Sequence, residues 1–311
     1  IVVEINRKLE LNLQIVDIYR NSTIEELVNS ISKNKTNGIE DLGRITEKEQ
    51  KITEEIELLK ERVLSTGSLN AEEVEDIYPM SDIEKGMAFS SLMMKQGVYH
   101  EQLLFQKKIE KFNIQRFTEA LELLVSKHEI LRTEFNLGDY DTEIQIVRKT
   151  VPVTVYYQDI SMMKAPGQNE VIKKYLSDEL EIPFDYKSKL WRMSVFEKEN
   201  NNMIFVFQFH HSIMDGWSVA SFITELNNLY LKLQNDPFFK PEKLKTNYKN
   251  YIIQQEIIKS NLNTSQFWKN ELSEYTRLDL FTEKDQYESH RFSLGSDFLK
   301  KLKKAKTLFN A

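Results

Sequence analysis

Residues 203–216 read MIFVFQFHHSIMDG, and this stretch decides the fold. Its first part, Met203–Phe209, is apolar at both alternating sets of positions, which is typical of a central strand buried on both faces. The polar run Glu199–Asn202 separates it from another apolar run, Trp191–Phe196, and such a turn-rich break predicts a hairpin. Asp-Gly at the end of the stretch is a tight-turn pair, so we expect a long helix to follow over 217–233.

Strands and helices alternate on either side of this hairpin, which predicts an α/β fold arranged as a two-layer α+β sandwich. The spacing of the apolar residues predicts strands near 103–109, 143–147 and 151–157, and helices near 114–128 and 170–180. After Pro237 the sequence predicts polar helices to residue 274, a strand near Phe292 and a helix over 296–307.

The first 75 residues show helical patterns and a polar segment, and not the alternation of strands and helices described above. Ile1–Ile31 predicts helices, one of them opened by a capping box of Thr23 and Glu26. Residues 33–43 are polar and turn-rich, and 45–64 carry an apolar stripe on a charged segment, which predicts an amphipathic linker helix lying on the next domain. Apolar helical patterns without caps at both ends lead us to expect that the chain was cut from a longer protein.

Composition narrows the classes of function. The 311 residues are 41% hydrophobic and 29% charged, which is ordinary for a folded chain of two or three structural units. A net charge of −6 with intermixed signs leaves no basic surface for nucleic acid. The absence of cysteine excludes disulfides, thiolate metal sites and a cysteine nucleophile, and it fits a cytoplasmic protein. No apolar run is long enough for a membrane span, and the nine glycines form no nucleotide-binding fingerprint.

His210 and His211 follow the most buried strand directly and are the candidates for chemistry. A strand end holds an imidazole rigidly, and histidine accepts a proton near neutral pH. Amides at the helix start, such as that of Gly216, can donate to an oxyanion. We expect Asp215 to be buried in the turn and paired with Arg132 or Arg192, so that it braces the turn.

A purely structural role for these residues is the alternative. Two histidines after an apolar strand can cap it with hydrogen bonds, and Asp-Gly is a common turn. A metal site is disfavoured, because adjacent strand residues point to opposite sides and no third histidine has ligand spacing. We expect His100, His128 and His290 to be structural or surface residues.

The run His210–Gly216 matches the pattern HHxxxDG, and with three other segments it resembles the condensation domain of nonribosomal peptide synthetases. These segments are Lys127–Phe135, which resembles the family's arginine-bearing second motif, Tyr78–Ser81 with Gly86-Met87, which resembles its opening motif, and the aromatic residues Tyr248, Tyr251 and Phe267-Trp268. The resemblance extends from about Asp76 to the C-terminus. The opening motif departs from the family at Ile83-Glu84-Lys85, where relatives have a glutamine-centred sequence, and this leaves the donor-side subtype open.

The resemblance implies a chloramphenicol acetyltransferase-like fold, in which two lobes form a V around a tunnel. The implied reaction is attack of a carrier-bound acceptor amine on a carrier-bound donor thioester, which forms an amide. His211 would either accept the amine proton or position the amine, and Gly216 would contribute its amide. His210 would be structural, and Asp215 would form a structural ion pair with Arg132 or Arg192.

The resemblance also implies a domain order. Residues 1–33 would be the last helices of a peptidyl carrier domain, 34–75 a linker, 76–236 the N-terminal lobe and 237–311 the start of the C-terminal lobe. The carrier's phosphopantetheine serine would precede Ile1. The expected cofactor is therefore 4'-phosphopantetheine on partner carrier domains, with no metal. The expected partners are donor and acceptor carriers and an adenylation domain, with no nucleic acid or membrane.

Two other functions remain open at this point. An epimerisation domain, or one that performs both epimerisation and condensation, shares the HHxxxDG pattern. A noncatalytic recruiting domain on the same fold is the alternative from another class, although we expect such a domain to have lost the motif histidine that His211 retains.

Overall fold

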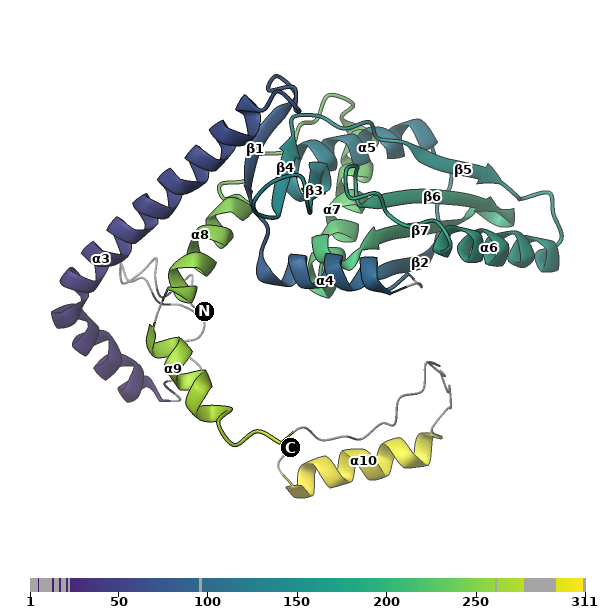
Figure 1. The fold of residues 1–311 in the computed structure, drawn as a ribbon. Helices are drawn as coiled ribbons and strands as arrows, with labels where there is room; N and C mark the ends of the chain where they lie inside the picture. Colours follow the sequence, from purple (N-terminus) through teal and green to yellow (C-terminus); the bar gives the residue numbers. More distant parts are fainter. Residues whose placement is uncertain are drawn as a thin grey trace. The chain divides into compact units, whose positions relative to one another are not determined.

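The computed structural model describes residues 23–94, 97–260, 262–276 and 295–309, and residues 5, 13, 17 and 21 singly. The chain forms two compact units, Ile1–Leu262 and Asn263–Ala311. The first unit contains two β-sheets with helices against them (Figure 1). Within the described ranges, no helix combines the length and apolar character needed to cross a membrane.

The larger sheet has four strands in the order β2-β7-β6-β5. Its strands are β2 (His100–Lys108), β5 (Val155–Asp159), β6 (Trp191–Lys198) and β7 (Asn202–His210). β7 is antiparallel to both β2 and β6, whereas β5 runs parallel to β6. The predicted hairpin and the central position of its second strand are therefore confirmed. The register pairs His100 with His210, at the end of the sheet where the candidate site lies.

Both faces of β7 are covered, which explains its continuous apolar sequence. Phe205 and Phe207 belong to the main core, which includes the apolar faces of α5 (Ile114–Lys127) and α7 (Gly216–Asn235). Ile204 and Val206 point to the other face and pack with α6 (Ala165–Leu180). These three helices were expected from the sequence, although α6 begins five residues earlier than 170, with a proline in its first turn.

The smaller sheet has the order β1-β4-β3, with all pairings antiparallel. It consists of β1 (Val74–Pro79), β3 (Thr133–Asn136) and β4 (Ile144–Arg148). Of these strands only β4 was predicted. The sequence VEDIYP of β1 mixes charges with apolar residues and ends in proline, and β3 has four residues, so neither shows a clear alternation.

The linker helix is longer than predicted. α3 spans Ile24–Ser65 without a break, so the expected turn-rich interruption at 33–43 is wrong. That segment holds no proline, and its glycines lower helix stability by only about 1 kcal/mol each, which a helix tolerates. The second half of α3 buries Ile56 beside Tyr78 and Ile252, and Val63 beside Val74.

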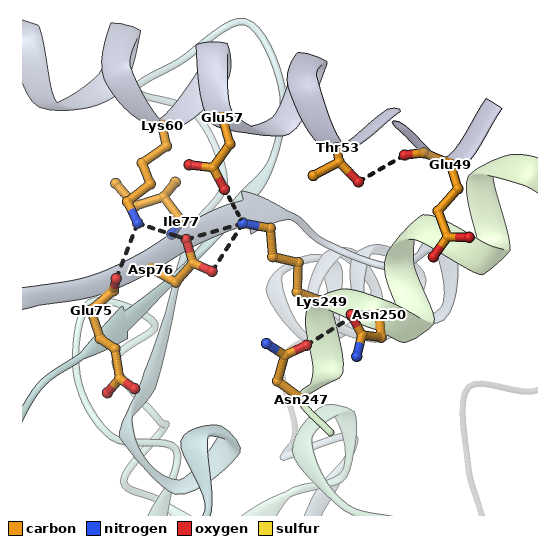
Figure 2. A network of polar contacts seen from close by, with 10 residues as sticks. All are labelled: Glu49, Thr53, Glu57, Lys60, Glu75, Asp76, Ile77, Asn247, Lys249 and Asn250. Carbon is orange, nitrogen blue, oxygen red and sulfur yellow. Dashed lines mark hydrogen bonds and ion pairs between the residues drawn. The ribbon is translucent and has the colours of Figure 1, made fainter. Parts of the chain in front are cut away.

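Polar contacts accompany this packing where α3 meets β1 and α8 (Tyr248–Lys259), as Figure 2 shows. Lys249 lies between Asp76, at 3.1 Å, and Glu57, while Lys60 contacts the other oxygen of Asp76 at 2.9 Å. α3 is therefore held against β1 and α8 by both apolar and charged contacts.

The remaining elements are short. They are α4 (Asp82–Met93), the 3-10 turns η1 (Glu129–Arg132), η2 (Glu199–Asn201) and η3 (His211–Ile213), α9 (Leu262–Glu271) and α10 (Ser296–Phe309). α10 agrees with the helix predicted over 296–307. The strand expected near Phe292 and most of the carrier helices expected over 1–31 lie outside the described residues.

Candidate active site

His210, the last residue of β7, is 3% exposed and hydrogen-bonded on both ring nitrogens. Nδ1 lies 2.6 Å from the Ser212 hydroxyl and also accepts the Ser212 N–H at 3.3 Å. Nε2 lies 2.9 Å from the Ser91 hydroxyl and 3.1 Å from that of Tyr186. Because the Ser91 hydroxyl donates to the carbonyl of Val98, it is left to accept a proton from Nε2.

These contacts define a neutral His210 with its proton on Nε2. Burial, reinforced by the nearby His100 and His211, lowers the pKa of His210 to about 4. A ring that is neutral, buried and bonded on both sides holds the end of β7 in place. This environment suits the structural role that the resemblance implies for His210, and its partners Ser91 and Tyr186 come from distant parts of the chain.

His211 begins the turn after β7 and is only partly buried. Its backbone N–H donates to the carbonyl of Tyr99 at 2.7 Å, and its ring atom Nδ1 lies 2.7 Å from the carbonyl of Met214. A carbonyl only accepts, so Nδ1 must carry the proton, and the neutral ring then has its lone pair on Nε2. This is the form of histidine that accepts a proton.

Tyr99 supports this turn in an unusual backbone conformation. Its φ of 66° lies in the left-handed region, which costs a non-glycine residue on the order of 1 kcal/mol. In that conformation its carbonyl accepts the amide of His211, and its ring centroid lies 6.4 Å from that of His211. Nothing in the sequence around Tyr99 signals this role.

Gly216 and Asp215 open α7 beside the histidine turn. Asp215 is the N-cap, and its Oδ1 accepts the N–H of Ser218 at 2.7 Å, which lowers the pKa of this exposed carboxyl. Gly216 is the first helical residue, so its amide has no partner within the helix. A Cβ at Gly216 would meet no atom within 4 Å.

The expected ion pair of Asp215 with an arginine is wrong. Asp215 is exposed, and neither arginine pairs with it among the described residues. Arg132 is buried, contacts Glu75 at 2.5 Å and donates to the carbonyl of Val125 at 3.0 Å. The expectation failed because sequence distance does not show which acid an arginine meets.

Arg192 lies on β6 and is bound to the last turn of α6 and to the segment that follows it. It contacts Glu179 at 2.8 Å and donates to the carbonyls of Ile182 and Pro183, both at 2.9 Å. Its guanidinium also lies over the ring of Phe184, 4.6 Å from the centroid. Like Arg132, it ties elements together away from Asp215.

A cavity of about 560 Å³ borders His210. Ser91, Tyr186, His100 and Phe184 contribute to its wall, so it contains both polar and aromatic surface. Among the described residues, no group of three His, Asp or Glu side chains is placed to hold a metal ion.

Solved structures with a similar fold include condensation domains. The first condensation domain of the calcium-dependent antibiotic synthetase aligns with a TM-score of 0.57 and 14% identity, over 65% of this chain and 49% of that chain. The starter condensation domain of the rhizomide synthetase aligns with a TM-score of 0.56 and 13% identity, again over 65% and 49%. The two-sheet α/β architecture is thus that of condensation domains.

Sequence relatives agree with the fold. One component of the plipastatin synthase of Bacillus subtilis (strain 168) is 30% identical over 253 residues, 75% of this chain and 10% of that protein. Gramicidin S synthase 2 of Brevibacillus brevis is 28% identical over 208 residues, 66% of this chain and 5% of that protein. The model of the family described as "Condensation domain" matches residues 74–308, and the chain belongs to this family.

Proposed function

We propose that this chain forms an amide bond in nonribosomal peptide synthesis. An acceptor amine on one carrier domain attacks the thioester carbonyl of a donor acyl or peptidyl group on another. The new C–N bond forms, the C–S bond breaks, and the proton lost by the amine balances the thiolate that leaves. Both substrates would be borne on 4'-phosphopantetheine arms of the carrier domains.

The observation that carries this proposal is the orientation of His211. With Nδ1–H fixed on the Met214 carbonyl at 2.7 Å, the Nε2 lone pair is available to accept the amine proton or to hold the amine. The amide of Gly216, which has no partner within the helix, is suited to an oxyanion formed at the attacked carbonyl. His210, Arg132 and Arg192 would act as structural supports, and Asp215 as the helix cap.

The proposed partners follow from the reaction. They are a donor and an acceptor peptidyl carrier domain, with an adenylation domain that loads the acceptor. Residues 1–33 would be the end of the carrier that precedes this domain, and 34–75 its linker. We place the reaction in the cytoplasm, as the cysteine-free sequence predicts.

The test is single-turnover amide formation between a loaded donor carrier and a loaded acceptor carrier. The domain should be completed to the length of the solved condensation domains, because this chain covers about half of theirs. Amide product is the expected result. Exchange of the donor's α-hydrogen with solvent, without amide product, would instead show epimerisation, and binding of both carriers with neither reaction would show a recruiting domain.

A further inference from the structure

Glu84, in the first turn of α4, is 0% exposed. One of its oxygens is well satisfied: Oε2 accepts the N–H of Ser81 at 2.7 Å, the Ser81 hydroxyl at 2.8 Å and Nε2 of Gln145 at 3.1 Å. None of the ion pairs among the described residues includes Glu84, and the adjacent Lys85 contacts Glu143 at 3.2 Å instead. A buried carboxylate without a cation is costly.

The buried hydroxyl of Tyr78 lacks a hydrogen-bond partner among the described residues, and so do two buried oxygens of the hydrogen-bonded side chains Glu84 and Gln145. These two oxygens are Oε1 of Glu84 and Oε1 of Gln145. The amide of Gln145 is oriented by its Nε2, which donates both to Oε2 of Glu84 and to the carbonyl of Pro79 at 3.2 Å. A flipped amide would place its oxygen against that carbonyl, so Oε1 of Gln145 remains an acceptor that needs a donor.

We propose that Glu84 is held as a neutral carboxylic acid, whose Oε1–H donates to Oε1 of Gln145, so that the acid and the amide form a cyclic pair of two hydrogen bonds. One proton satisfies both unpartnered oxygens. Without it, each would incur a desolvation cost of roughly 1–3 kcal/mol.

The surroundings of Glu84 include influences that raise its pKa and influences that lower it. The start of a helix and hydrogen bonds from Ser81, Tyr248 and Gln145 favour the carboxylate. Burial opposes them and is the larger effect, so the pKa of Glu84 is raised. The titratable side chains that face it are the phenols of Tyr78 on β1 and Tyr248 on α8, whose pKa values are raised chiefly by burial.

The charged groups near these phenols provide no positive charge that would stabilise an ionised Glu84. Asp76 on β1 and Glu129 on η1 both raise the pKa of Tyr78 further. Asp76 is itself paired with Lys60 and Lys249, which are thereby engaged away from Glu84. The surroundings therefore favour the neutral acid.

The hydrogen-bonded pair of Glu84 and Gln145 links three elements, one of which also contributes to the candidate site. It connects α4 to β4, and the Ser81 hydroxyl that contacts Glu84 also accepts the hydroxyl of Tyr248 on α8 at 3.3 Å. α4 in turn carries Ser91, a partner of His210. Loss of the proton at high pH would weaken this junction whether or not the chain forms amides.

The sign of the effect follows from proton binding. A carboxyl with a raised pKa in the folded state binds more protons folded than unfolded above its ordinary pKa of about 4.3. Its contribution to stability is complete below that pH and is lost as the pH rises through the folded value. Glu84→Gln removes this titration but keeps a cyclic pair, because an amide also offers one donor and one acceptor to Gln145.

We would compare urea midpoints of the full 311-residue chain and its Glu84→Gln variant at about pH 5 and about pH 8. The variant should match the parent at the lower pH and have the higher midpoint at the higher pH. Glu119→Gln, on an exposed helix face, should show no such gain in midpoint over the parent at the higher pH. A Glu84→Gln variant that is less stable than the parent at both values would show that the ionised carboxylate is the native form.

An infrared measurement on the parent alone covers the case in which the variant does not fold. A protonated carboxylic acid has a C=O band distinct from that of a carboxylate. We expect this band to persist at about pH 6, where an ordinary glutamate is ionised. Its absence there would overturn the proposal.

Discussion

At the residue scale, the two adjacent histidines have opposite environments. His210 is enclosed and bonded at both nitrogens, whereas His211 is fixed through Nδ1 and keeps its Nε2 lone pair. The difference arises because His210 is the last residue of β7, whereas His211 begins the 3-10 turn η3. His210 thus stabilises the turn, whereas His211 keeps a ring nitrogen available for a substrate.

The pKa of His210 provides a prediction. Since burial lowers it to about 4, the folded protein binds fewer protons than the unfolded chain between pH 6.5 and that value. The free energy of unfolding should therefore fall as the pH is lowered through this window, by at most about 3 kcal/mol from this residue. NMR titration of the His210 ring should give a midpoint near 4; a midpoint at the ordinary value would contradict the buried neutral form.

Substitution of Gly216 distinguishes a role in folding from a role at the candidate site. Its φ is not left-handed and a Cβ would meet no atom, so Gly216→Ala should leave stability unchanged or raise it by up to about 1 kcal/mol. Amide formation should nevertheless fall, because the Cβ would occupy space next to the amide that we propose as the oxyanion donor. Thermal unfolding and the carrier assay, run on the same variant, measure the two effects. Undiminished activity would remove Gly216 from the site.

At the element scale, Asp215 acts through the helix that it caps. Asp215→Ala should cost about 1 kcal/mol through loss of the bond to the Ser218 amide, while Asp215→Asn should retain most of the stability because asparagine caps equally well. Urea unfolding of both variants distinguishes the cap from the ion pair that the sequence suggested. Equal losses in the two variants would mean that the charge, and not the cap, is required.

α3 is a structural part of the first unit. Ile56 is buried against α8 and β1, so Ile56→Ala should lower the free energy of unfolding by about 2–5 kcal/mol. Leu58→Ala is the matched control, because Leu58 lies in the same helix but is 59% exposed, and its change should be small. Similar effects of the two substitutions would show that α3 is not packed as described.

The elements differ in how well the sequence predicted them. α5, α7, β6 and β7 were predicted because each shows a clear apolar pattern, or a continuous run, over its length. β1 and β3 were missed because such short, mixed segments gain their strand form from pairing with β4. The break predicted in α3 was wrong because glycine only weakens a helix.

At the scale of the whole molecule, the candidate site assembles from segments that are far apart in the sequence. The histidine turn was predicted because one short motif contains it. Ser91, Tyr99 and Tyr186 were not, since they reach the motif only through tertiary contacts. For the same reason the sequence could propose arginine partners for Asp215 but could not establish them.

The position of His211 in this assembly is the central claim, and substituting it is the most direct test. In a domain completed to full length, single-turnover amide formation should fall about 10²–10⁴-fold for His211→Ala, the usual contribution of a general acid–base group. His128→Ala, which removes an imidazole bonded to Glu225 outside the site, should leave the rate unchanged. A folded His211→Ala variant that forms amide at the parent rate would contradict the account.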